Sequence, residues 1–275
     1  MSPIYVPGKV TLAKEFTQQN YMWEFPAQYG LWSPANITTA LWLDAADAST
    51  VTTVSGAVSQ WNDKSGNSRN FAQSTPSARP AYVSTGLNGK PTLAFQADDF
   101  MELSSSRISS TFTVVVVANA NALDVNTVLF AGSSKTNGNP RDQIDRLNAD
   151  VRMVSRNDAT TVVAPSQGTL TTADYIQSAT TSSTLAGVAL NGAALTTASA
   201  PGGTYSISVY TIGGLYAGSS AISAFHNGDI SELVYVAGEP STNIRQRLEG
   251  YLAHKWGLTA NLPNDHPYKL VGPTP

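Results

Sequence analysis

The sequence contains no cysteine and few charged residues. Asp, Glu, Lys and Arg together make up only 13% of its 275 residues. The absence of cysteine excludes disulfides, thiolate metal ligands and cysteine nucleophiles. The formal net charge of -3 leaves no basic stripe of the kind that nucleic acids or anionic membranes attract. We therefore expect neither nucleic acid nor a membrane as the main partner.

Long apolar runs are also absent. No stretch of about 18 apolar residues could span a bilayer, and residues 1–9 carry no apolar segment behind basic residues. We therefore expect a protein that is made in the cytoplasm without a signal peptide. A chain of 275 residues can bury roughly three quarters of its unfolded surface, so it can fold without covalent cross-links.

Residues 1–38 differ from the rest of the chain because aromatic residues are crowded there between prolines. The aromatic residues are Tyr5, Phe16, Tyr21, Trp23, Phe25, Tyr29 and Trp32. Proline fixes φ and removes an N–H donor, so this segment is predicted to be an extended arm and not a set of central strands. Free aromatic side chains would be poorly solvated. The arm is therefore expected to pack on its own domain or to dock onto a neighbouring subunit during assembly.

Residues 39–275 show short β-type runs separated by Gly, Asn, Asp, Ser and Pro. The clearest runs are residues 40–44, 58–61, 91–95, 111–118, 151–154, 207–216 and 229–236. Many short strands with turn signals between them predict an all-β sandwich or barrel. The run 111–118 is short and apolar on both faces, which is typical of a strand in the middle of a sheet that is covered on both sides. Asn191 and Gly192 stand between two β-type runs and predict a hairpin turn.

One helix is predicted near the C-terminus, over about 241–257. Ser241 is the expected N-cap, and Gly257 ends the helix. Apolar residues recur between them at steps of three and four, at Ile244, Leu248, Tyr251, Leu252 and Trp256. Arg245 and Glu249 are expected on a more exposed face, where a pair contributes only a few tenths of a kcal/mol.

Two parts of the sequence resemble the opening and closing motifs of one family. The first part is LWLDAADAST at 41–50 with VSQWNDKSG at 58–66, and the second is GDISELVY at 228–235 with RLEGYLAHKWG at 247–257. They look like motifs of laminin G-like, concanavalin A-like jelly rolls in bacteriophage virion proteins and bacterial surface proteins. The resemblance brackets residues from about 40 to 270. It implies a two-sheet antiparallel jelly-roll sandwich, with one sheet concave and ligand loops at an edge.

The resemblance also implies a role. Related domains bind glycans or proteins, sometimes with calcium, or hold particles together. We expect a non-enzymatic structural or binding component of a bacteriophage particle, of the capsid-decoration or tail-fibre type, located in the virion. Its partners would be other virion capsid or tail proteins, and the expected homo-oligomer is a trimer. A lectin-like, carbohydrate-binding module for a host-surface glycan is the alternative.

The residue patterns of catalysis on this fold are missing. A glycanase requires two carboxylates on one strand face, as in Glu-x-Asp-x-Glu. Glu232 is the only glutamate in the corresponding strand, and parity places Asp229 on the opposite face. We therefore expect Glu232 to be a hydrogen-bonded structural residue. The three histidines lack the Gln-x-His pairing of a lyase, so a hydrolase or lyase is the least favoured alternative.

The loop that follows residue 61 carries the polar residues best suited to bind a ligand. They are Asn62, Asp63, Lys64, Asn67 and Arg69. Asp44, Asp47 and Asp63 are the most calcium-like carboxylates, because calcium takes about six to eight oxygen ligands. Short Asp side chains also cap turns, and this interpretation is favoured over calcium. No other cofactor is expected, and Trp42 and Trp61 are expected in the core and not as sugar platforms.

Overall fold

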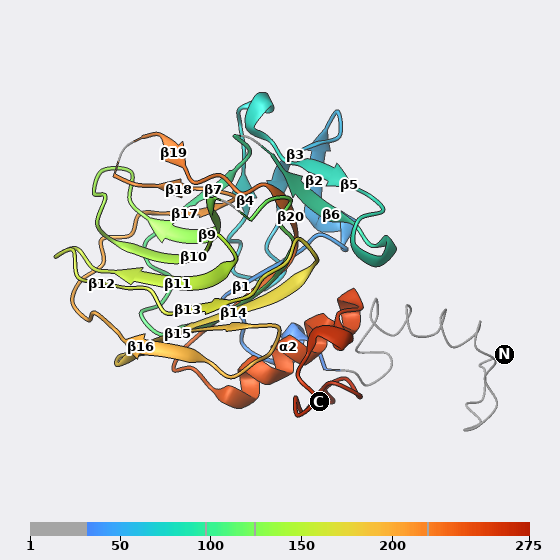
Figure 1. The fold of residues 1–275 in the computed structure, drawn as a ribbon. Helices are drawn as coiled ribbons and strands as arrows, with labels where there is room; N and C mark the ends of the chain where they lie inside the picture. Colours follow the sequence, from blue (N-terminus) through green and yellow to red (C-terminus); the bar gives the residue numbers. More distant parts are fainter. Residues whose placement is uncertain (1–31, 97, 124, 219) are drawn as a thin grey trace, which may run out of the picture.

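The computed structural model describes residues 32–275 apart from 97, 124 and 219 (Figure 1). The strands are β1 (Leu41–Asp44), β2 (Val51–Val54), β3 (Ala57–Trp61), β4 (Phe71–Ala72), β5 (Ala81–Val83), β6 (Thr92–Phe95), β7 (Met101–Ser104), β8 (Phe112–Ala118), β9 (Asn126–Ser133), β10 (Arg141–Leu147), β11 (Asp150–Arg156), β12 (Val162–Val163), β13 (Ser166–Gly168), β14 (Tyr175–Thr181), β15 (Leu185–Leu190), β16 (Thr196–Ser199), β17 (Val209–Ile212), β18 (Leu215–Tyr216), β19 (Ile222–Ser223) and β20 (Gly228–Ala237). The helix α2 covers Thr242–Trp256, and short 3-10 turns occur at Pro34–Asn36 (η2), Ala48–Thr50 (η3), Pro76–Ala78 (η4), Leu87–Gly89 (η5) and Thr259–Asn261 (η6).

The strands form two antiparallel layers. One layer runs β1-β20-β8-β14-β15-β16, and the other runs β7-β17-β9-β10-β11. Strands β2 to β6 connect the layers at one end. The predicted fold class is confirmed: the chain is an all-β, concanavalin A-like jelly-roll sandwich with one short C-terminal helix.

Strand β8 shows how the layers are held together. Val114 and Val116 face the main core between the two sheets, whereas Val115 and Val117 face the opposite side, beneath α2. All four side chains are fully buried, and each contributes about 1.5–3 kcal/mol by leaving water. The apolar run at 111–118 therefore forms a central strand that is covered on both faces, as predicted.

The helix α2 begins and ends where the sequence predicts. The Ser241 side chain accepts a hydrogen bond from the Ile244 amide, and Gly257 adopts a left-handed φ of 72°. Leu248, Tyr251, Leu252 and Trp256 pack on the outer face of the sheet. The helix therefore lies along one side of the sandwich, as Figure 1 shows.

The expected exposure of Arg245 and Glu249 is wrong, because both side chains are buried. The segment that follows α2 folds back over this face of the helix. His266 Nε2 lies 3.2 Å from Glu249 Oε2, and a Cβ on Gly250 would stand 2.4 Å from Tyr268. A helical pattern read alone cannot show that a later segment covers its polar face.

Trp32 is the one aromatic residue of the expected arm that the structure describes. Its side chain is buried, and its ring centroid lies 6.2 Å from that of Tyr251 in an edge-to-face contact. Its amide donates to the Pro273 carbonyl. Trp32 therefore packs on its own domain, while the arm residues Tyr5, Phe16, Tyr21, Trp23, Phe25 and Tyr29 lie outside the described residues.

The turn signals are only partly confirmed. Asn191 and Gly192 have φ values of 52° and 75°, but the partner strand β16 starts at Thr196, so the turn is longer than two residues. The long strand expected over 207–216 is two strands, β17 and β18. Gly213, with φ 82°, separates them. No helix in the described part of the chain is long and apolar enough to cross a membrane.

Candidate functional site

A buried charge cluster joins α2 to the sheet. The Lys255 ammonium lies 2.7 Å from Asp44 Oδ1 and 2.6 Å from Glu232 Oε2. The indole N–H groups of Trp42 and Trp256 donate to Glu232 at 2.8 and 2.7 Å. The Tyr251 hydroxyl donates to Glu232 at 3.2 Å. The residues of the most specific sequence motif therefore anchor the helix.

The cluster explains the protonation states of its two carboxylates. Burial by itself would raise the pKa of Asp44, but the ammonium groups of Lys255 and Lys64 hold that pKa below its usual value. Burial, with the Asp44 charge beside it, raises the pKa of Glu232 against the pull of Lys255. Since all four neighbours of Glu232 donate, the ionised carboxylate satisfies them best. Glu232 is a fully buried, hydrogen-bonded residue, as predicted.

The prediction that Asp229 and Glu232 lie on opposite faces of their strand is wrong. Ile230 and Leu233 both face the main core, because a β-bulge between Ile230 and Glu232 inserts one extra residue into β20. Asp229 and Glu232 therefore lie on the same face of the sheet. Asp229 Oδ2 accepts a hydrogen bond from Thr92 at 2.8 Å, so the two carboxylates have separate partners.

The predicted ligand loop uses its polar groups within the protein. Asp63 accepts from the amides of Trp42, Ser65 and Arg69, and Asn67 donates to the Thr39 and Ala40 carbonyls. The remaining predicted residues are also bonded: Arg69 to the Ala40 carbonyl, Asn62 to Gln60, and Lys64 to Asp44 and Asp47. Asp63, Asn67 and Arg69 tie the loop to the start of β1. Lys64 instead reaches Asp44 at the end of β1, and Asn62 bonds to Gln60 of β3.

The calcium-like carboxylates face a cation that belongs to the chain. The Lys64 ammonium lies 2.8 Å from Asp44 and 2.9 Å from Asp47, while Asp63 is separated from them by its own backbone partners. In the region 32–275, without 97, 124 and 219, no three His, Asp or Glu side chains come together as a metal site requires. Turn capping and ion pairing account for these residues, and calcium binding stays a prediction.

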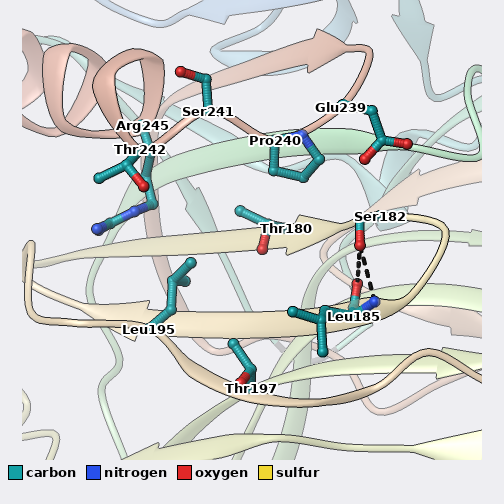
Figure 2. Close-up of a pocket in the computed structure, with 10 residues that line it drawn as sticks. All are labelled: Thr180, Ser182, Leu185, Leu195, Thr197, Glu239, Pro240, Ser241, Thr242 and Arg245. Atoms are coloured by element: carbon teal, nitrogen blue, oxygen red, sulfur yellow. Dashed lines mark hydrogen bonds between the residues drawn. The ribbon is translucent and has the colours of Figure 1, made fainter.

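The described surface has a pocket at the other end of α2. Its volume is about 310 Å³, and it lies between the first turn of the helix and strands β14 to β16. Figure 2 shows Glu239 and Pro240 on one side and the β14–β15 turn on the other. The lining residues are Thr180, Ser182, Leu185, Leu195, Thr197, Glu239, Pro240, Ser241, Thr242 and Arg245. Five of these ten side chains carry a hydroxyl group, and three are apolar.

The pocket is shaped by local structure on each side. Ser182 closes the β14–β15 turn by accepting from the Leu185 amide at 2.9 Å, as the dashed lines in Figure 2 show. The buried Arg245 guanidinium is held by Glu249 at 2.5 Å and by the Ala193 carbonyl at 3.2 Å. The first turn of α2 directs the positive end of its dipole toward the pocket. The arrangement offers many neutral hydrogen-bonding groups and one carboxylate, Glu239, which suits binding and gives no pair for acid–base chemistry.

This pocket was not predicted from the sequence. Ser241 was predicted as a helix cap, but half of the pocket lining comes from residues 180–197 of β14 to β16, about 40–60 residues away along the chain. Serine and threonine occur throughout this sequence, so nothing marks those that line a cavity. The available signal was the N-cap itself, since a helix start is a potential binding position.

Comparison with known proteins places the fold. No protein-family model matches the sequence, and no curated protein matches it. The binding domain of Paraclostridial mosquitocidal protein 1 aligns with a TM-score of 0.57 at 11% identity, over 79% of this chain and 53% of that chain. The receptor-binding domain of botulinum neurotoxin type G aligns with a TM-score of 0.55 at 10% identity, over 78% of this chain and 51% of that chain.

A carbohydrate-binding module also aligns over part of the chain. The CBM40 of the Ruminococcus gnavus IT-sialidase, solved with α2,3 sialyllactose, has a TM-score of 0.44 and 13% identity, covering 50% of this chain and 80% of that chain. The present chain spans about half the length of the two toxin domains that it matches. At these identities the likeness to the two toxin domains shows a shared fold, and a fold alone does not define a function.

Proposed function

We propose that this protein is a non-enzymatic binding component of a bacteriophage particle. The observation that carries the non-enzymatic part is the burial of Glu232, whose carboxylate is fully enclosed by Lys255, Trp42, Trp256 and Tyr251. A general acid must reach the proton-accepting atom of a substrate. Glu232 is instead committed to the attachment of α2, and Asp229 is engaged by Thr92.

The virion assignment is supported by the motifs at 41–66 and 228–257, which resemble those of phage jelly-roll proteins. In the structure these motifs meet: Trp42 of the first donates to Glu232 of the second, and Asp44 of the first pairs with Lys255 of the second. The sandwich serves as a scaffold in this proposal. Residues 1–31 dock onto capsid or tail proteins, and the protein acts as a homo-oligomer, with a trimer as the working assumption.

Truncation at residue 31 tests the docking proposal. Removing residues 1–31 keeps Trp32 in its contact with Tyr251, so the sandwich should stay folded while incorporation into phage particles is lost. Incorporation is measured by immunoblotting of purified particles, and the oligomeric state by light scattering. Removing residues 1–36 is the matched control for stability, because loss of a buried Trp costs about 3–5 kcal/mol. Normal incorporation of the folded 32–275 chain would contradict the proposal.

A saccharide-binding role is the second candidate, and the pocket at α2 favours it. Hydroxyl groups from Thr180, Ser182, Thr197, Ser241 and Thr242 surround apolar patches there, which matches the mixed polar and apolar surface of a sugar. Thr197→Trp should fill the pocket and abolish binding on a glycan array. Thr196→Trp is the matched control, because alternation along β16 directs residue 196 to the opposite face. Equal glycan binding by both variants would exclude the pocket.

A further inference from the structure

The outer face of the β10–β11 pair carries two arginines directly opposite each other. Arg141 and Arg156 are cross-strand partners, so their side chains leave the same face with Cβ atoms about 4.5–5.5 Å apart. Ile144 and Met153 of the same two strands face the main core, which places the arginines on the side away from the core. Like charges in this position are destabilising unless something neutralises them.

No described carboxylate forms an ion pair with either guanidinium: the charge of Asp145 acts on Arg141 without direct contact, because Asp145 is itself paired with Arg152. The guanidinium of Arg141 donates to the Gly138 carbonyl at 2.8 Å, and that of Arg156 donates to the Asn139 side-chain oxygen at 2.9 Å. Neither forms an ion pair with a described carboxylate, whereas Arg152, also on this face, is paired with Asp145. Burial, followed by the charge of Arg156, lowers the pKa of Arg141.

The two guanidinium groups converge on consecutive residues of one well-held loop. The Asn139 amide donates a hydrogen bond to the Asn137 side-chain oxygen, and the Asn139 side chain donates to the Asp158 carbonyl. The Asp158 carboxylate is engaged by the Ser206 amide and hydroxyl. The Arg156 Nε is buried and has no hydrogen-bond partner among the described residues. Donors are therefore held near one another with part of their capacity unused.

We propose that Arg141 and Arg156 form a binding site for an oxyanion. Guanidinium groups match sulfate, phosphate and carboxylate because two parallel N–H groups meet two oxygens. The bound group would offset the repulsion between the two arginines. The ligand class is a free inorganic oxyanion or the sulfate of an acidic polysaccharide. This site is separate from the pocket at α2 and does not depend on the proposed function.

Sulfate is the first probe. We expect sodium sulfate to raise the melting temperature of the protein above its value in sodium chloride of equal ionic strength, and isothermal titration to show saturable binding. Arg156→Gln and Arg141→Gln should each weaken sulfate binding about tenfold or more, because each removes charged hydrogen bonds. Arg79→Gln is the matched control, since Arg79 also donates only to carbonyls, those of Gln73 and Ser74, and should leave binding unchanged.

The possible outcomes distinguish a polymer ligand from a free oxyanion, and one of them would overturn the proposal. Dextran sulfate bound more tightly than sulfate, with uncharged dextran inert and Arg156→Gln deficient, would identify a polymer ligand. Sulfate binding without polymer binding would identify a free oxyanion. Sulfate stabilisation that is the same in all variants would reflect the general effect of this salt and overturn the proposal. If one Gln variant does not fold, the other variant tests the proposal. Arg156→Lys keeps the positive charge but removes the parallel N–H groups of the guanidinium, so it tests whether their geometry is required.

Discussion

The two sides of the sandwich differ in how their charged side chains are paired. Beneath α2, the carboxylates Asp44 and Glu232 share the Lys255 ammonium, and Asp44 also receives Lys64. On the outer face of β10 and β11, Arg141 stands opposite Arg156 and neither has a carboxylate partner among the described residues. We call the first the closed side, because its charges are paired, and the second the open side, because these two arginines have no carboxylate partner among the described residues.

The difference teaches where function can reside in this fold. Buried charges are tolerated only when they are paired and hydrogen-bonded, so the cluster of Asp44, Glu232 and Lys255 has no capacity left for a ligand. The strongest sequence motif lies on that closed side. A recognisable motif therefore reports the attachment of α2, while Arg141 and Arg156 lie in segments that no motif marks.

The largest expected effect comes from removing the shared ammonium group of the buried charge cluster on the closed side. Lys255→Met leaves Asp44 and Glu232 buried without their shared ammonium, and this should lower the free energy of unfolding by about 3–5 kcal/mol. Urea denaturation followed by tryptophan fluorescence measures the loss. Lys90→Met, at a partly exposed lysine, is the control and should stay within about 0.5 kcal/mol of the parent. A similar small loss for Lys255→Met would show that the cluster contributes little to stability.

A smaller effect is expected from His226, in the connection from β19 to β20 between the two sides. Burial, with the nearby Arg146, lowers its pKa from 6.5 to about 3. The folded protein therefore keeps the ring neutral while the unfolded chain takes up a proton below pH 6.5. Stability from this group is complete above pH 6.5 and is lost as the pH falls toward 3, by about 2 kcal/mol at pH 5.

Carboxylates also titrate in this range, so a variant must isolate the histidine. The difference in unfolding free energy between pH 7 and pH 5 should be about 2 kcal/mol smaller in His226→Phe than in the parent. Urea titrations at both pH values give this difference. An unchanged pH dependence would mean that the His226 ring can be protonated in the folded state.

The smallest expected effect comes from removing the repulsion between Arg141 and Arg156 on the open side. Without added oxyanion and at low salt, Arg156→Gln should stabilise the protein by about 0.2–1 kcal/mol, because it removes a like-charge cross-strand pair. The gain should shrink in 0.5 M sodium chloride, where screening is strong. A loss of stability at low salt would show that the Asn139 contact of Arg156 outweighs the repulsion, and the contrast between the two sides would weaken.

Several features could be predicted because they depend on local sequence. The limits of α2 follow from the Ser241 cap and from Gly257, and the double burial of β8 follows from its uninterrupted apolar run. The role of Glu232 as a hydrogen-bonded residue followed from the lack of a second suitably placed glutamate. The predicted ligand loop at 62–69 shows the limit of such reasoning, because polar side chains look the same whether they bind a ligand or their own backbone.

Other features depended on contacts between distant residues. The β-bulge in β20 reverses the parity between Asp229 and Glu232. The fold-back of residues 258–270 brings His266 onto Glu249, and the β15–β16 connection meets Arg245 through the Ala193 carbonyl. None of these features has a local signal, because all arise from how one segment fits against another. The opposed arginines likewise become neighbours only through the register of β10 with β11.

The sequence by itself determined the β-sandwich class, the helix with its caps, and the apolar strands of the core, since hydrophobic period and capping act over a few residues. Only the tertiary structure decided which charges are paired, where the pocket at α2 opens, and which arginines meet. The physical reason is that burial and Coulomb interactions depend on distances in space, and strand register sets those distances between residues far apart in the chain.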